Sequence, residues 1–335
     1  MRDKALWSRE YAQAKLFVWF VPALHFFTLG FARINDLLFD GSRSPERLEA
    51  ALRSGDAMQV YQFGNLESVG RGWMLLAAFV LALVQFGTER RNGSQEFLFS
   101  LPYSRRRIFC TKWLFGAALI VSTFSLNTAI DMVAVLSSPA AELFSLGYHF
   151  TQWLYSVVLL LAAYSFVALV GTITGTVASQ TTLSLFLWAA PMSMYIVADE
   201  SFGIMFGRDL FPDSYLYEEL QDFINIPGYI ALSYEFITWG KMVVFALVAG
   251  ALVLLGMRGY ERNKPENNGK FLMFGWLELA VQTAIVVLAS LLAGNFAAGV
   301  VRLGDGRLGF LFGLAIGCAA SLLLTAKLKR IRLKS

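Results

Sequence analysis

About eight long apolar runs, separated by shorter polar stretches, constrain this chain more than any other feature. Each run is roughly 17 to 24 residues long, which is the length that an α-helix needs to cross a hydrocarbon core of about 30 Å. Charged residues make up 16% of the chain, whereas a soluble domain carries about 25%. The sequence therefore predicts an all-α, polytopic membrane protein with about eight transmembrane helices.

Short polar segments surround the predicted spans. Residues 1–15 mix both charge signs with apolar side chains, which is typical of an amphipathic elbow helix in the membrane interface. Pro22 is expected to kink the first span. A short helix is expected after that span, with Ser44 as its cap, Pro45 in its first turn and Gly55 at its end. The spans are expected at 16–32, 73–87, 104–135 or 108–135, 153–175, 183–198, 242–257, 276–296 and 308–326, with a turn at 176–182.

The placement of Lys and Arg predicts the orientation. With eight spans and a cytoplasmic N-terminus, the cytoplasmic segments hold four of these residues near the N-terminus, six in 89–112, four in 258–270 and five in the tail, which leaves nine of the 28 for the other side. Both termini are therefore expected in the cytoplasm. The basic residues are scattered at helix ends, so the net charge of +4 indicates anchoring at the membrane rather than binding to nucleic acid.

Few residues in the chain are of the types that perform chemistry. Its two cysteines, Cys110 and Cys318, fall near or inside predicted spans without a CxxC motif, and its two histidines, His25 and His149, are far apart. No metal-ligand spacing, no nucleophile motif and no GxxxxGK[ST] phosphate loop is present. We therefore expect no catalytic residue, metal or cofactor on this chain. A membrane-embedded enzyme is disfavoured because no reactive set converges at membrane depth.

The most informative polar stretch lies at residues 89–112, between the second and third spans. Asn92 or Ser94 is expected to cap a short helix, Pro102 to end it, and Ser104 to cap the span that follows. The short helix carries the apolar side chains Phe97, Leu98, Phe99 and Leu101. An apolar element of two turns between basic flanks needs a membrane surface or another protein to cover it.

The basic residues on both sides of this short helix are compatible with either a membrane surface or another protein as its cover. Three cations at 105–107 stand in the first turn of the third span, where they oppose the helix dipole. Lipid phosphates or acidic residues of a partner must then stabilise the positive charges of Arg105 and its two neighbours. The same groups could pair with Arg90 and Arg91. From these features alone an interfacial connector held by anionic lipid is favoured over a docking element.

The order of residues in this stretch resembles the segment after the second span of ABC-2-type (type V) transporter permeases. In that family the segment, here 89–104, forms a cytoplasmic coupling helix that sits in a cleft of the ATP-binding subunit. The resemblance covers about 24 residues and implies that they couple this chain to a separate subunit that binds ATP and Mg²⁺. The matched residues are Glu89, Gly93, Ser94, Glu96, Leu101, Pro102, Ser104, Arg105 and Lys112, and Phe97, Leu98 and Phe99 would enter the partner's groove.

The wider layout is similar to the same family. An elbow at 1–15, a six-helix core at 16–258 and a larger outer loop between the fifth and sixth spans match its arrangement. The region 259–335 adds a linker, two spans and a basic tail, and its Tyr260, Arg262, Glu266 and Gly269 resemble a Gram-positive subgroup often tied to antimicrobial peptides or envelope stress. The resemblance implies an exporter permease in a bacterial cell membrane that pairs with a second or homologous permease. A non-transporting sensor or scaffold is the alternative.

Polar residues inside the spans are further candidates. Asn127 and Asp131 lie four residues apart, on one face of the third span. An intramembrane acid is by default a functional candidate, so this pair is a candidate for the substrate pathway. A solvated or helix-pairing role is favoured, because Asp131 is only about a turn from the outer end. Glu278 and Gln282 are similar, and His25 is expected to be a packing residue.

Small residues recur at helical spacing in two spans. In the fourth span Gly171 and Gly175 form a GxxxG pattern, which lets helix backbones approach closely. The last span repeats this spacing, and packing within the chain is favoured there over a dimer interface. The residues of the last span are Gly309, Gly313, Gly317 and Ser321.

Overall fold

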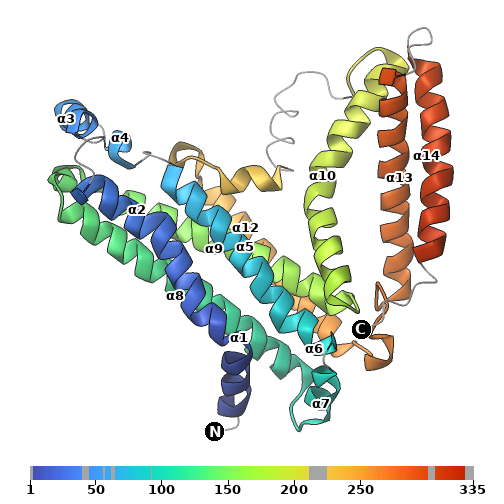
Figure 1. Ribbon diagram of the computed structural model, residues 1–335, viewed down its shortest axis with the longest axis horizontal. Helices are drawn as coiled ribbons and strands as arrows, with labels where there is room; N and C mark the ends of the chain where they lie inside the picture. Colours follow the sequence, from blue (N-terminus) through green and yellow to red (C-terminus); the bar gives the residue numbers. More distant parts are fainter. Residues whose placement is uncertain are drawn as a thin grey trace. The chain divides into compact units, whose positions relative to one another are not determined.

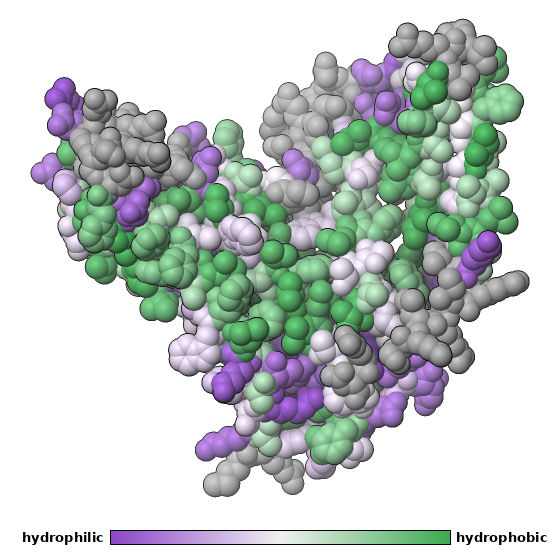
Figure 2. All heavy atoms as spheres, in the orientation of Figure 1, coloured by the Kyte–Doolittle hydropathy of each residue, from purple (hydrophilic) through white to green (hydrophobic). Residues whose placement is uncertain are grey.

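The computed structural model describes residues 3–39, 45–55, 57–61, 65–91, 93–210, 225–300 and 306–328, and these residues are helical except for connecting turns and one isolated bridge between Thr174 and Leu272 (Figure 1). Within these described ranges, eight helical segments are long and apolar enough to cross a membrane. The prediction of an all-α, polytopic membrane protein is confirmed. Figure 2 shows hydrophobic residues along the helices and hydrophilic residues gathered at the end where α6 and α7 lie.

The helices follow one another along the chain with short connections. The first half contains α1 (Asp3–His25), η1 (Phe26–Gly30), α2 (Phe31–Ile34), η2 (Asn35–Phe39), α3 (Pro45–Ser54), α4 (Met58–Tyr61), α5 (Leu66–Ala82), η4 (Leu83–Gly87), α6 (Thr88–Arg91), α7 (Ser94–Ser100), α8 (Arg105–Leu136), η5 (Pro139–Leu143) and α9 (Leu146–Ile173). The second half contains α10 (Val177–Phe206), η6 (Ile226–Ile230), η7 (Tyr234–Phe236), α12 (Trp239–Glu261), η8 (Pro265–Asn267), α13 (Gly275–Val300) and α14 (Arg307–Leu328). The turns η1, η2 and η4 are π-helical, so they widen the first two spans locally.

Two compact units make up the chain. Unit 1 comprises Met1–Thr172 and Tyr229–Asn263 and holds α1, α5, α8, α9 and α12. Unit 2 comprises Ile173–Gly228 and Lys264–Ser335 and holds α10, α13 and α14. The fifth span therefore groups with the last two, whereas the predicted organisation puts it in a six-helix core. The predicted boundaries at 15 and 258 stay a prediction.

The N-terminal segment is continuous with the first span. Helix α1 runs through residue 15 without a break, and Pro22 lies inside it. Leu6, Glu10 and Ala14 are buried at intervals of four residues, so one face of the predicted elbow packs against its own unit. An interfacial elbow helix separate from the span stays a prediction.

The connections differ from expectation at one turn. The short helix after the first span is present as α3, and Gly55 ends it with a φ of +68°; Ser44 lies outside the described residues. The predicted turn at 176–182 is wrong, because α10 already begins at Val177. Thr176 caps it by accepting a hydrogen bond from the backbone N–H of Ser179.

Gly175 has a different role from the predicted one. Helix α9 ends at Ile173, so Gly175 does not share a helix face with Gly171, and the predicted GxxxG pair is wrong. Its backbone N–H donates to the Lys270 oxygen at 3.1 Å, and its oxygen accepts from Gly269 at 3.1 Å. A Cβ at Gly175 would lie 2.9 Å from the Lys270 nitrogen. Close backbone approach within unit 2 explains the glycine.

In unit 2, α13 and α14 pack closely through small residues. A Cβ at Gly317 would lie 2.6 Å from the Ala293 Cβ, and a Cβ at Gly313 would overlap the Ala293 oxygen. On the other helix a Cβ at Gly294 would lie 2.8 Å from the ring of Phe310. Gly309 and Ser321 are also buried. The spacing of four residues therefore marks the face of α14 that packs on α13.

Replacing Gly317 by Leu should destabilise unit 2. The larger side chain must push α14 away from α13, and such overpacking costs about 1–3 kcal/mol. Unfolding of the full chain in mixed micelles, titrated with a denaturing detergent, measures the change. Gly299→Leu is the matched control, because no heavy atom lies within 4 Å of a Cβ at that site. Equal stability of the two variants would contradict the assignment.

Candidate functional site

The stretch between α6 and α8 folds into a short helix held at both ends. Helix α7 begins at Ser94 and ends at Ser100, and Gly93 precedes it with a left-handed φ of +67°. Ser94 is therefore the first helical residue and not the cap, and its hydroxyl donates to the Glu89 oxygen at 3.4 Å; Asn92 lies outside the described residues. Ser104 caps α8, as predicted, by accepting from the Arg107 N–H at 3.3 Å.

The apolar side chains of this stretch point in different directions. Phe97 is 63% exposed, whereas Leu98 is 0% exposed. Leu98 belongs to a buried cluster of unit 1 that includes Leu6 of α1, Phe86 of η4, Ile108 of α8 and Tyr260 of α12, and Phe99 and Leu101 pack against that cluster. Leu98 lies in the interior here, so the prediction that it enters a partner's groove does not fit this conformation. Phe97 is the large apolar side chain that this helix exposes, beside the polar Glu96 and Ser100.

Arg105 is held by its own chain. Its guanidinium lies 4.3 Å from the centre of the Phe99 ring and donates to the backbone oxygens of Asn263 at 2.5 Å and Glu261 at 3.1 Å. The ring of Tyr260 meets the Phe99 ring edge to face at 5.4 Å. The expectation that lipid or partner acids must favour this cation is therefore wrong for Arg105, since the C-terminal end of α12 supplies the acceptors.

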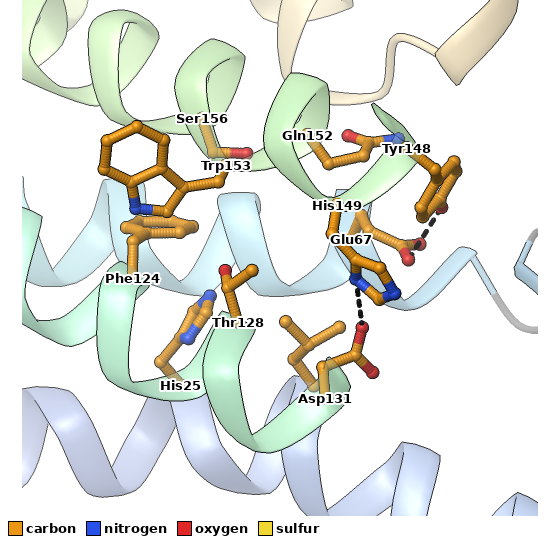
Figure 3. Close-up of a pocket in the computed structure, with 11 residues that line it drawn as sticks. His25, Glu67, Phe124, Thr128, Asp131, Tyr148, His149, Gln152, Trp153 and Ser156 are labelled. Carbon is orange, nitrogen blue, oxygen red and sulfur yellow. Dashed lines mark hydrogen bonds and ion pairs between the residues drawn. The ribbon is translucent and has the colours of Figure 1, made fainter. Parts of the chain in front are cut away.

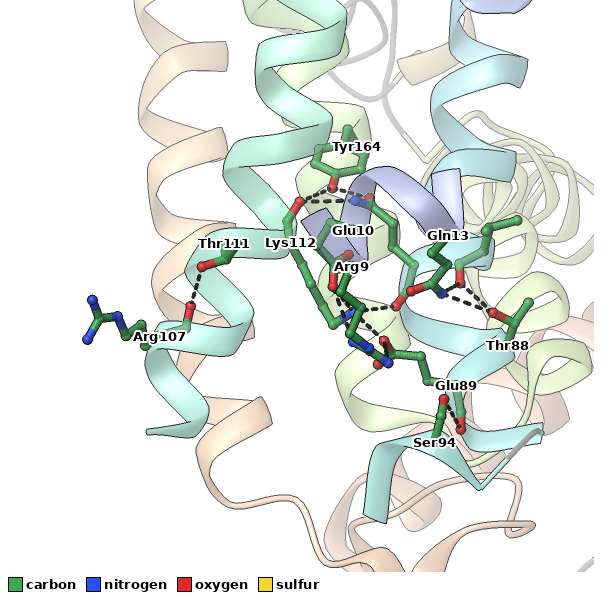
Figure 4. A network of polar contacts seen from close by, with 12 residues as sticks. Arg9, Glu10, Gln13, Thr88, Glu89, Ser94, Arg107, Thr111, Lys112 and Tyr164 are labelled. Carbon is green, nitrogen blue, oxygen red and sulfur yellow. Dashed lines mark hydrogen bonds and ion pairs between the residues drawn. The ribbon is translucent and has the colours of Figure 1, made fainter. Parts of the chain in front are cut away.

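Lys112 is the centre of a buried ionic network (Figure 4). Its Nζ lies 2.8 Å from Glu10 Oε1 and 2.5 Å from Glu89 Oε1, and it donates to the Gln85 oxygen at 3.3 Å. Arg9 pairs with Glu89 at 2.8 Å. Lys112 is 0% exposed and both glutamates are buried. Two cations thus meet two carboxylates in this network, and buried charges require such opposite partners; Arg90 next to Glu89 is a further buried cation, and its guanidinium nitrogens have no hydrogen-bond partner among the described residues.

Neutral groups extend this network to α9. The amide of Gln85 donates to the Lys112 oxygen at 3.1 Å, and Tyr164 donates to Gln85 Oε1 at 2.6 Å. Gln13 of α1 donates to the Val84 oxygen in the π-helical turn η4 at 2.8 Å. We call Arg9, Glu10, Gln85, Glu89, Lys112 and Tyr164 the Lys112 network. It joins the first four spans of unit 1 at the end where α7 lies.

Asp131 is the centre of a second network, towards the other end of α8. Arg33 donates to its Oδ1 at 2.9 Å, and Nδ1 of His149 lies 3.2 Å from its Oδ2. Arg33 also pairs with Glu67 at 2.7 Å, and the Tyr148 hydroxyl donates to the same carboxylate oxygen at 2.8 Å. Asp131 is 3% exposed, so a solvated role is wrong and helix pairing is confirmed. We call these five residues the Asp131 network.

Asn127 and His25 pack nearby in unit 1. The Asn127 amide donates to the Thr123 oxygen at 3.0 Å and to the Pro22 oxygen of α1 at 3.4 Å. The His25 ring lies 4.3 Å from the ring of Phe124, which is the packing role that was expected. Asn127 and Asp131 both tie α8 to the first span, and a contact of either with substrate stays a prediction.

Sequence reasoning missed most partners in these networks, and also Arg71. This buried arginine of α5 donates to the backbone oxygens of Ile230 at 2.8 Å and Leu232 at 2.7 Å, and to Gln152 Oε1 at 2.8 Å. Within unit 1 it thereby holds the segment before α12 against α5 and α9. The available signal was an ionisable residue at the edge of an apolar run, which demands a partner.

Outside the spans, burial raises the pKa of the Tyr61 phenol, so this hydroxyl stays protonated while it donates to the Leu143 oxygen.

Comparison with known proteins gives two relatives. No family model and no solved structure matches the chain. It is 24% identical over 245 residues to the probable ABC transporter permease YtrC of Bacillus subtilis (strain 168), which covers 70% of this chain and 72% of that protein. It is 24% identical over 258 residues to the probable ABC transporter permease YtrD of the same organism, which covers 73% and 74%.

These similarities and the eight apolar helices agree on the class of protein. They support a permease subunit of an ABC transporter, which is a multi-pass protein of the cell membrane. They imply a non-catalytic membrane subunit that associates with an ATP-binding subunit, where the ATPase activity resides. Among the described residues no group of three or more His, Cys, Asp or Glu side chains could hold a metal ion.

Replacing Lys112 by Met should destabilise unit 1 strongly. The change leaves Glu10 and Glu89 buried with less compensation, and removing one partner of a buried ion pair costs about 3–5 kcal/mol. Denaturant-dependent unfolding in mixed micelles measures this. Lys15→Met on the exposed side of α1 is the matched control and should stay within about 0.5 kcal/mol.

A double variant separates charge from packing. Adding Glu89→Gln to Lys112→Met removes one of the stranded carboxylates, so it should recover part of the lost stability. Additive losses in the double variant would show that the contact between these two residues contributes little.

Proposed function

We propose that this chain is the transmembrane permease subunit of an ABC-2-type exporter, in which ATP hydrolysis on a separate subunit drives efflux of a substrate. Helix α7 is the coupling helix in this proposal, both termini are cytoplasmic, and ATP and Mg²⁺ bind to the partner. A second copy of the chain or a homologous permease completes the transporter. The spans α13 and α14 correspond to the two additional spans of the Gram-positive subgroup.

The exposure of Phe97 carries this proposal. It stands beside a fully buried leucine on a helix of seven residues, so one face of α7 is fixed in the interior and the other is open. A lone aromatic side chain that projects from a fixed helix outside the spans suits insertion into a groove of a partner protein. The similarity to two permeases supplies the class of that partner.

The anchoring of α7 gives the coupling a physical basis. Phe99 and Arg105 connect the end of α7 to α12, and Glu89, next to its start, pairs with Lys112 of α8 and Arg9 of α1. A displacement of α7 must therefore move these spans or break buried contacts. Different docking of the ATP-bound and nucleotide-free partner would bias the equilibrium between two arrangements of the spans.

Replacing Phe97 by Asp should weaken binding of the ATP-binding subunit by about 30-fold, because a central aromatic contact is worth about 2 kcal/mol or more. Affinity is measured by titrating the purified partner onto the chain in lipid nanodiscs, together with ATP hydrolysis and substrate flux in vesicles. Phe99 is unsuitable for this test because it packs within unit 1.

Phe236→Asp is the matched control. Phe236 is 61% exposed, lies in unit 1 outside the spans and is not part of α7. Its substitution should leave affinity within about twofold. Unchanged affinity and flux in Phe97→Asp would overturn the assignment of α7, and ATP hydrolysis stimulated by ligand without flux would favour a sensor.

A further inference from the structure

Both histidines of the chain border one small cavity in unit 1 (Figure 3). The cavity has a volume of about 20 Å³ and lies beside the Asp131 network. His25 of α1 is 1% exposed and His149 of α9 is 2% exposed. Each ring has one nitrogen without a hydrogen-bond partner in the described structure, Nδ1 of His25 and Nε2 of His149. Buried polar atoms of this kind normally have a partner, which is often an ordered water.

The contact with Asp131 determines the chemical character of His149. Its Nδ1 lies 3.2 Å from Asp131 Oδ2, and a carboxylate only accepts, so Nδ1 must carry the proton. In the neutral ring Nε2 then has a free lone pair and is an acceptor. The ligand that satisfies it must therefore be a hydrogen-bond donor.

The charges around the cavity favour the neutral ring. Arg33 pairs with Asp131 and with Glu67. Arg71 donates to Gln152 and not to a carboxylate, but it is a second buried cation that interacts electrostatically with Glu67, so two cations balance two anions without a charge on His149. The remaining titratable groups near the ring are the phenols of Tyr61 and Tyr148 and, across the cavity, His25. An added proton on His149 would leave an uncompensated charge in the interior.

The cavity has room and partners for one small molecule. A volume of about 20 Å³ exceeds the roughly 10–15 Å³ that one water needs. Thr128 and Ser156 also line it, so hydroxyl groups can complete the two to four hydrogen bonds that a buried water makes.

We propose that this cavity is a binding site for one neutral hydrogen-bond donor, a water molecule, with Nε2 of His149 as its acceptor and Asp131 as the residue that sets the tautomer.

Nitrogen-15 NMR of the full chain in nanodiscs, labelled only at histidine, tests this site. The chain has two histidines, so His25→Gln leaves the signals of His149 alone. At neutral pH we expect the tautomer protonated at Nδ1, with magnetisation transferred from water to Nε2. A ring protonated at Nε2, or an Nε2 without contact to water, would overturn the proposal.

Two variants test the tautomer and the water separately, each alongside a measurement of its unfolding transition. Asp131→Asn should move the proton from Nδ1 to Nε2, because the Asn amide can donate to Nδ1. Ser156→Val should fill the cavity and abolish the transfer from water while Nδ1 keeps its proton. Retention of the water signal in Ser156→Val, with an unchanged unfolding transition, would place the water elsewhere and refute this site.

Discussion

The buried ammonium group of Lys112 is the constraint on which the rest of unit 1 depends. A charge at 0% exposure is tolerable only if opposite charges and hydrogen bonds surround it, and here Glu10 of α1 and Glu89 of α6 do so. Helices α1, α6 and α8 must therefore meet at one point. Asp131 lies 19 residues further along α8, roughly 28 Å at 1.5 Å per residue. One helix thus carries a buried cation near one end and a buried anion near the other.

The spans were predictable because hydrophobic length is a local property, but their ends were not. Helix α9 begins at Leu146, whereas hydropathy predicted a start near residue 153. The prediction was late because Tyr148, His149 and Gln152 are polar, and hydropathy assigns polar residues to a loop. Their polar atoms contact Glu67, Asp131 and Arg71 inside the unit. Hydropathy measures the preference of single residues for lipid and does not register that two polar residues satisfy each other.

The ion pairs were unpredictable for a related reason. Lys112 pairs with Glu10, 102 residues earlier in the chain, and nothing in the sequence distinguishes this acid from the others. The orientation of α7 was equally undetermined. Phe97 and Leu98 are neighbours in sequence, and which of them faces inward depends on where Leu6 and Tyr260 lie. A short helix lies inside the matched stretch, but the motif could not separate the residues that hold this helix from the apolar residue that it exposes.

The two networks restrict how a transporter built on this unit could move. Both join the first, second, third and fourth spans, through Arg9, Glu89, Lys112 and Tyr164 at one end and Arg33, Glu67, Asp131 and His149 at the other. Separating these spans at either end would strand buried charges at a cost of several kcal/mol per ion. A rearrangement that keeps the pairs therefore moves the four spans as one body. Helix α7 is joined to that body through Ser94 and Glu89, so a displacement applied at Phe97 would be transmitted to all four spans together.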